Sequence, residues 1–171
     1  SKSQSSSISL VLRDLSSIPE LHVPSLCEIW NWQGDTSVLP YKFAEVLNAV
    51  ANENKEIIGF DQPQVFDVKN LKQQYIDVGS FDPNGFFFLT YRSHAIGLCL
   101  VVPNSSQPHT LNIKFLSCVP SHREKGVEQA LITLALNYCK NQGAQTVLLL
   151  FDEGDLLSYH QTVAKSIAVN Q

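Results

Sequence analysis

The stretch Leu116–Leu131, LSCVPSHREKGVEQAL, decides the fold that this sequence predicts. An apolar run over 111–119 ends at Pro120, a short polar loop with basic side chains follows, and Gly126 opens a long segment with apolar residues at helical spacing. This order predicts strand, loop and helix. Because the first amides of a helix lack intrahelical partners and lie at its positive end, the loop predicts a site for an anionic group such as a phosphate. A solvated basic loop is the alternative interpretation.

The rest of the chain supplies strands and helices on both sides of this stretch. Short β-rich runs predict strands over 8–15, 86–91, 95–102 and 146–151, with a tight turn at 92–94 making the middle two a hairpin. Helical spacing predicts helices over 17–32 (starting near Pro24), 41–54, 68–78, 127–141 and 155–169. Since 146–151 is almost wholly apolar and follows a helical crossover, we expect it to lie parallel to 111–119.

These elements predict an α/β (α+β) fold, with a mixed, mostly antiparallel sheet flanked by helices. We expect residues 1–7 to form a disordered tail and 8–171 a single domain, which suits a chain of 171 residues. The chain contains no methionine, even at position 1, which suggests a trimmed or excised chain.

Composition narrows the classes of function. The net charge of -4 gives no overall basic surface, so we expect no nucleic-acid partner, and no apolar run is long enough to span a membrane. The four cysteines, Cys27, Cys99, Cys118 and Cys139, lie in apolar segments without a CxxC pair or a nearby histidine. This pattern predicts buried reduced thiols, no metal site and a cytoplasmic protein.

The loop also resembles a known family. Val119-Pro120 followed by Arg123-Glu124-Lys125-Gly126-Val127-Glu128 is similar to the acyl-CoA-binding motif of the GNAT (Gcn5-related N-acetyltransferase) superfamily, Arg/Gln-x-x-Gly-x-Gly/Ala after a strand. Arg123 and Gly126 match the motif, whereas Glu128 replaces its last small residue. The element order over roughly 9–166 is also similar to that of the family, except that the two strands usual after the last helix are missing.

This resemblance implies acetyl-CoA as cosubstrate and a small-molecule or peptide amine as acceptor. It places the pantetheine arm along the end of the strand and the pyrophosphate around the loop. The implied acetyl-CoA contacts are Leu116, Ser117, Cys118, Val119, Arg123, Glu124, Lys125, Gly126, Val127, Glu128 and Gln129. The amide of Cys118 or Val119 would polarise the thioester carbonyl. A second domain or a partner chain would complete the C-terminal side of the sheet.

The catalytic groups follow the family less closely. Where several family enzymes have a glutamate base, this chain has Asn112, which cannot accept a proton; Lys114 and His109 are titratable neighbours, and we interpret His109 as a solvated loop residue. Tyr159 stands where the family's acid belongs, and the alternative is an aromatic residue at the edge of the core. The acidic run at 152–155 is interpreted as a helix start rather than as an amine-binding site.

Two classes of function therefore stand. The first is an acyl-CoA-dependent N-acyltransferase that transfers acetyl to an amine. The alternative is a non-catalytic GNAT-like domain that senses acyl-CoA or forms part of a larger multidomain protein, which Asn112, Glu128 and the missing strands favour. An unrelated phosphate-binding domain would need a second ligand motif, and we find none. The sequence does not name the acceptor.

Overall fold

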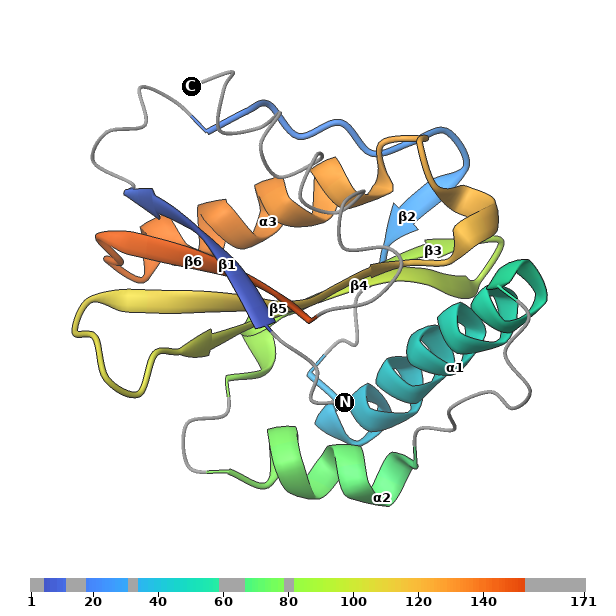
Figure 1. The fold of residues 1–171 in the computed structure, drawn as a ribbon, viewed down its shortest axis with the longest axis horizontal. Coiled ribbons are helices and arrows are strands. Elements are labelled where there is room, and N and C mark those ends of the chain that lie inside the picture. Colours follow the sequence, from blue (N-terminus) through green and yellow to red (C-terminus); the bar gives the residue numbers. More distant parts are fainter. Residues whose placement is uncertain (1–4, 12–17, 31–33, 59–66, 79–81, 153–171) are drawn as a thin grey trace.

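The computed structural model describes residues 5–11, 18–30, 34–58, 67–78 and 82–152, and these form one sheet with helices on both faces (Figure 1). The sheet has six strands in the spatial order β1-β6-β5-β4-β3-β2. The strands are β1 (Ser5–Val11), β2 (Cys27–Ile29), β3 (Phe86–Tyr91), β4 (His94–Pro103), β5 (Thr110–Cys118) and β6 (Thr146–Asp152). The helices are α1 (Leu39–Ile58), α2 (Val68–Leu71), which a π-type turn extends over 72–76, and α3 (Val127–Asn141).

The sheet is mixed and mostly antiparallel, as predicted. β5 and β6 are parallel and α3 connects them, whereas the other neighbouring strands are antiparallel. α1 and α2 lie on one face of the sheet and α3 lies on the other (Figure 1). The hairpin of β3 and β4 turns through Arg92 and Ser93, both with positive φ, a pair that matches the right-handed twist of the strands.

Each face of the sheet carries its own core. Under α3, buried side chains of β4, β5 and β6 pack against the apolar stripe of the helix, including Leu131, Ala135 and Leu136. Under α1, Phe43 forms ring contacts with Phe86 and Phe115. The two helices thus bury opposite faces of the same strands, which fixes the central strands at the middle of the domain.

One predicted helix is wrong. The described part of 17–32 contains the edge strand β2, which pairs with β3, and no helix. The apolar residues there have helical spacing, but Leu26 and Ile29 are 69% and 42% exposed, so they do not form a buried stripe. Leu26 also has a φ of 64°, which an α-helix does not allow. The chain instead enters the sheet edge just after Pro24.

The N-terminal segment also differs from the expectation. β1 begins at Ser5, so residues 5–7 of the predicted tail belong to a strand, and it pairs with β6 from Ser5↔Asp152 to Val11↔Thr146. The outer edge of β6 is therefore already paired, and a strand from elsewhere would have to add beyond β1. The predicted strand residues 12–15 and the predicted helix 155–169 lie outside the described residues.

Candidate functional site

The sheet opens between its two parallel strands. β5 and β6 are paired from Thr110↔Thr146 to Ile113↔Leu149, yet β5 continues to Cys118 and β6 to Asp152. Beyond Ile113, the register therefore leaves the backbone edge of β5 without a partner on β6. Openings at the carboxyl ends of parallel strands are where open α/β sheets bind ligands, because backbone groups there are not used by the ladder.

A bulge at Phe115 shapes this open part of β5. Leu98 pairs with Ser117 and Leu100 with Lys114, so β5 carries one extra residue, and Phe115 has a φ of 56°. Such a φ is rare for a bulky residue and marks a position that its surroundings hold in place. The ring of Phe115 packs at 5.0 Å from that of Tyr75. The bulge therefore bends β5 where the strands separate.

The same bulge changes which side chains face α3. Before it, Ile113 packs in the core under α3; after it, Leu116 and Cys118 do so, while Phe115 packs under α1. A regular strand would have kept the odd-numbered residues on the α3 side. The extra residue thus places Cys118 beside the start of α3.

One backbone amide at the end of β5 points into the opening. The Val119 amide donates to the Ile96 carbonyl of β4 at 2.8 Å, so it is already used. Since amide directions alternate along a strand, the Cys118 amide points to the opposite side, toward the opening. Of the two amides that the sequence suggested, the direction of the Cys118 amide favours it over that of Val119 as the predicted contact of a ligand carbonyl.

The loop after β5 exposes the start of α3. Gly126 precedes the helix with a φ of 90°, a conformation suited to glycine, and no side chain caps the helix. Glu124 also has a positive φ, 62°. Gly126 thus supplies no side chain to the first amides of α3, and an anion at these amides stays a prediction. The loop also borders a cavity of about 450 Å³, whose lining includes Pro24, Cys27, Tyr91, His122, Lys125 and Val127.

Gly97 brings the start of α3 close to the sheet. A Cβ at this position would lie 2.6 Å from Val127 Cγ1 and 3.0 Å from Leu131 Cδ1. The first turn of α3 can therefore sit directly on β4 only because residue 97 has no side chain. A glycine inside a strand is a sequence signal of such close approach, and the sequence reasoning did not use it.

The structure gathers the predicted binding residues around the end of β5 and the start of α3, but with different exposure. Leu116, Cys118, Val119, Val127 and Glu128 are buried, Ser117, Arg123 and Gly126 are half-buried, and Glu124, Lys125 and Gln129 are exposed. The Lys125 ammonium donates to the Ser121 carbonyl at 3.2 Å. Tyr159 lies outside the described residues, so its role as acid stays a prediction.

Glu128 gives the site an unusual electrostatic feature. Its side chain is 0% exposed, and neither carboxylate oxygen accepts a hydrogen bond of normal geometry. It lies near the Cys118 thiol, whose pKa is raised first by burial and then by the Glu128 charge, while Arg123 opposes the shift. A thiol is a weak donor, so we regard this contact as electrostatic and the carboxylate as unsatisfied.

The expected base position is occupied by a residue held in a polar pair. The Asn112 Oδ1 accepts a hydrogen bond from Asn104 Nδ2 at 3.0 Å. Lys114 lines a cavity under α2 together with Tyr75. His109 is an exposed loop residue whose carbonyl accepts from Gln145 and Thr146, in agreement with the interpretation of this residue as solvated.

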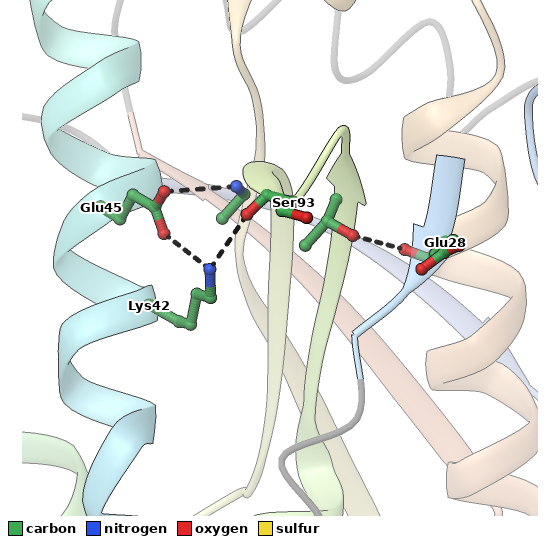
Figure 2. Close-up of polar contacts among 6 residues, drawn as sticks. Glu28, Lys42, Glu45 and Ser93 are labelled. Atoms are coloured by element: carbon green, nitrogen blue, oxygen red, sulfur yellow. Dashed lines mark hydrogen bonds and ion pairs between the residues drawn. The ribbon is translucent and has the colours of Figure 1, made fainter. Parts of the chain in front are cut away.

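Lys42 and Glu45 of α1 form polar contacts with the β3–β4 hairpin that the sequence analysis did not predict (Figure 2). β4 has a bulge next to the Thr90↔Ala95 pair, where the register with β3 shifts by one residue. Glu45 accepts from that amide at 3.4 Å and pairs with Lys42 at 3.1 Å, and Lys42 donates to the Ser93 carbonyl at 3.4 Å. The available signal was the Lys42–Glu45 spacing of three residues on a helix.

No group of three or more His, Cys, Asp or Glu side chains within the described ranges could hold a metal ion. None of the helices described has the length and apolar character needed to cross a membrane. All four cysteines are free thiols, and three are buried while Cys27 is half-buried.

The known proteins that this chain is similar to are acetyltransferases. Residues 16–159 match the sequence model of the Acetyltransferase (GNAT) family. No curated protein sequence matches the chain. A GCN5-related N-acetyltransferase from Sphaerobacter thermophilus has a similar structure, with a TM-score of 0.58 at 15% identity over 90% of this chain; the chain spans only 44% of that protein.

Two shorter proteins are similar in structure over most of their own length. Ard1 from Thermoplasma volcanium gives a TM-score of 0.54 at 15% identity, covering 82% of this chain and 81% of that one. The ribosomal-protein-S18-alanine N-acetyltransferase from Escherichia coli gives 0.51 at 11% identity, covering 82% and 76%. At these identities the likeness concerns the fold.

Proposed function

This chain belongs to the acetyltransferase (GNAT) family, and we propose that it is an acyl-CoA-dependent N-acyltransferase that transfers acetyl from acetyl-CoA to an amine. The observation that carries this proposal is the continuous path from the open edge of β5 to the uncapped start of α3. A thioester arm can pair with the former while a diphosphate meets the amides of the latter. The four free thiols support a reducing compartment such as the cytoplasm.

The proposed reaction is direct attack of the amine on the thioester carbonyl. The Cys118 amide stabilises the oxygen as it gains negative charge, because a fixed donor in a site shielded from water is most effective there. The carbon–nitrogen bond forms, the carbon–sulfur bond breaks, and the amine proton passes to water. Tyr159 would protonate the departing thiolate. The acceptor is a small-molecule or peptide amine.

The alternative, a domain that binds acyl-CoA without turnover, has its own support. The Asn112 amide cannot remove a proton and is held by Asn104. Glu128 brings a buried carboxylate next to the proposed diphosphate site. Titration with acetyl-CoA followed by an assay over a panel of amines separates the three cases: binding with turnover supports the enzyme, binding without turnover the sensor, and no binding contradicts both.

Three variants test the binding site itself. Gly126→Asp should weaken acetyl-CoA binding by roughly 2 kcal/mol or more, since charge-assisted hydrogen bonds are worth about 1.5–3 kcal/mol each. Glu128→Gly should tighten binding, offset by up to about 1 kcal/mol of helix propensity. Arg123→Ala should weaken it in a salt-sensitive way.

A matched control separates an effect local to the loop from the general cost of a charged residue at a positive φ. Gly34 also has a positive φ, 81°, and a Cβ there meets nothing within 4 Å. Gly34→Asp therefore introduces the same strained residue away from the loop and should leave affinity unchanged. If Gly126→Asp and Glu128→Gly both leave affinity unchanged, the loop does not hold a diphosphate.

A further inference from the structure

The starting observation is a buried carboxylate without a hydrogen bond at a helix start. Glu128 is the second residue of α3 and 0% exposed, and apart from its contact with the weakly donating Cys118 thiol neither oxygen has a hydrogen-bond partner. A buried charge is normally paired, because desolvation is costly. At the same helix start, the proposed function places a diphosphate, and this inference rests on that placement.

The described groups around Glu128 do not cancel its charge by a hydrogen bond. From β5, the Cys118 thiol faces it; from the loop, Arg123 acts on the same thiol with the opposite sign. Lys125 and Glu124 on this loop are exposed, and the Lys125 ammonium is bonded to the Ser121 carbonyl. The amides at the start of α3 would therefore serve two competing anions, one of them belonging to the protein.

We propose that the donor binds together with one proton, which Glu128 takes up. A diphosphate at the start of α3 disfavours the ionised carboxyl, since like charges at close range favour the neutral form of the group that can titrate. The proton comes from solvent, forms the O–H bond of the Glu128 carboxyl, and returns to solvent when the donor leaves. No bond in the donor changes. Glu128 thus makes donor affinity fall as pH rises.

Titration calorimetry with acetyl-CoA measures this uptake directly. The same titration in two buffers with different ionisation enthalpies gives the number of protons taken up, and it needs no variant. In the pH range where Glu128 is ionised in the free protein but protonated in the complex, proton linkage weakens the affinity for acetyl-CoA by up to about tenfold for each unit that the pH rises. We expect uptake approaching one proton for the unchanged chain across that range.

Two variants assign the proton to one residue. Glu128→Gln keeps the shape without the charge, so it should lose the uptake and bind more tightly at high pH. Asp77→Asn removes an exposed carboxylate beside α2, on the other face of the sheet (Figure 1), and should retain the pH slope of the unchanged chain. Titration of the ligand's own phosphates is common to all the proteins and cancels in the comparison.

The outcomes separate this inference from the proposed function. Acetyl-CoA binding with no proton uptake, or with equal uptake in Glu128→Gln, would overturn the role of Glu128 and leave the donor site standing. Absence of binding in every protein at every pH would overturn both. Binding by Glu128→Gln but not by the unchanged chain at high pH would support the inference.

Discussion

Replacing Gly97 by alanine tests how closely α3 must sit on the sheet. The new Cβ would lie 2.6 Å from Val127 Cγ1 and 3.0 Å from Leu131 Cδ1, well inside the usual carbon–carbon contact of about 3.5–4.0 Å. Both side chains are buried, at 1% and 0% exposure, and Val127 is β-branched and therefore stiff at χ1.

These contacts give an estimate of how much Gly97→Ala lowers the free energy of unfolding. Overpacking a filled core costs about 1–3 kcal/mol, while the loss of glycine's freedom in the unfolded chain returns about 0.4–1 kcal/mol. We expect Gly97→Ala to lower the free energy of unfolding by about 1–2 kcal/mol. Urea unfolding followed by circular dichroism should show a lower midpoint with an unchanged slope.

A double-mutant cycle with Val127→Ala supplies the control. Shortening Val127 alone removes buried methyl groups and destabilises the protein, but it also makes room for a Cβ at Gly97. The double variant should therefore be more stable than the sum of the two single losses predicts, by at least about 0.5 kcal/mol. Additive losses, or no loss in Gly97→Ala, would refute the close approach of α3 to β4.

Three further predictions concern other parts of the domain. The Tyr138 hydroxyl donates to Asp82 Oδ2, and the pKa of Tyr138 is raised first by burial and then by this carboxylate. Because the folded state holds the Tyr138 proton more tightly, the free energy of unfolding should fall as pH rises past about 10. In urea unfolding, Tyr138→Phe should show a smaller fall over the same pH range. Glu45→Ala leaves the Ala95 amide without its acceptor and should cost about 1 kcal/mol, which Glu45→Gln should largely restore in the same assay. A thiol-reactive dye should label Cys27 first in the folded protein, because the other three cysteines are buried. Labelling of a second cysteine at the same rate as Cys27 would contradict this arrangement.

The centre of the fold could be predicted because several sequence signals agree there. For α3, helical spacing, the glycine before it and Gly143 after it predict the same bounds that the structure shows. β3 and β4 follow from two apolar runs around a turn of two residues. The apolar run of β6 and the crossover before it predict a parallel neighbour of β5, which the register confirms.

The edges of the sheet could not be predicted because their residues obey weaker constraints. Leu21, Leu26 and Ile29 have helical spacing, yet around this short edge strand Leu26 and Ile29 stay exposed and only Leu21 packs against the core. Spacing predicts a helix only if one face is buried, and the sequence alone does not state burial. The pairing of β1 with β6 joins the first and the last of the described strands, and no local pattern encodes such a long-range choice.

The site shows the same division between backbone and side chains. The motif predicted where the loop meets α3, because a glycine with positive φ and an uncapped helix start are local properties. It could not predict the bulge at Phe115, since a positive φ at phenylalanine has no sequence signature. That bulge is what moves Cys118 to the α3 side, next to Glu128.

The departure at Glu128 therefore has a different meaning in the structure than in the sequence. In the sequence motif, Glu128 is a bulky residue in place of a small one, and a side chain that points outward would leave the ligand site open. The structure gives it no such freedom, because its carboxylate is buried at the helix start and lies near the Cys118 thiol. A carboxylate buried at the proposed diphosphate site would repel the diphosphate unless it took up a proton, because like charges at close range disfavour each other. The proposed donor site and the proposed proton uptake therefore rest on the same first turn of α3, and the Glu128→Gln titration tests them together.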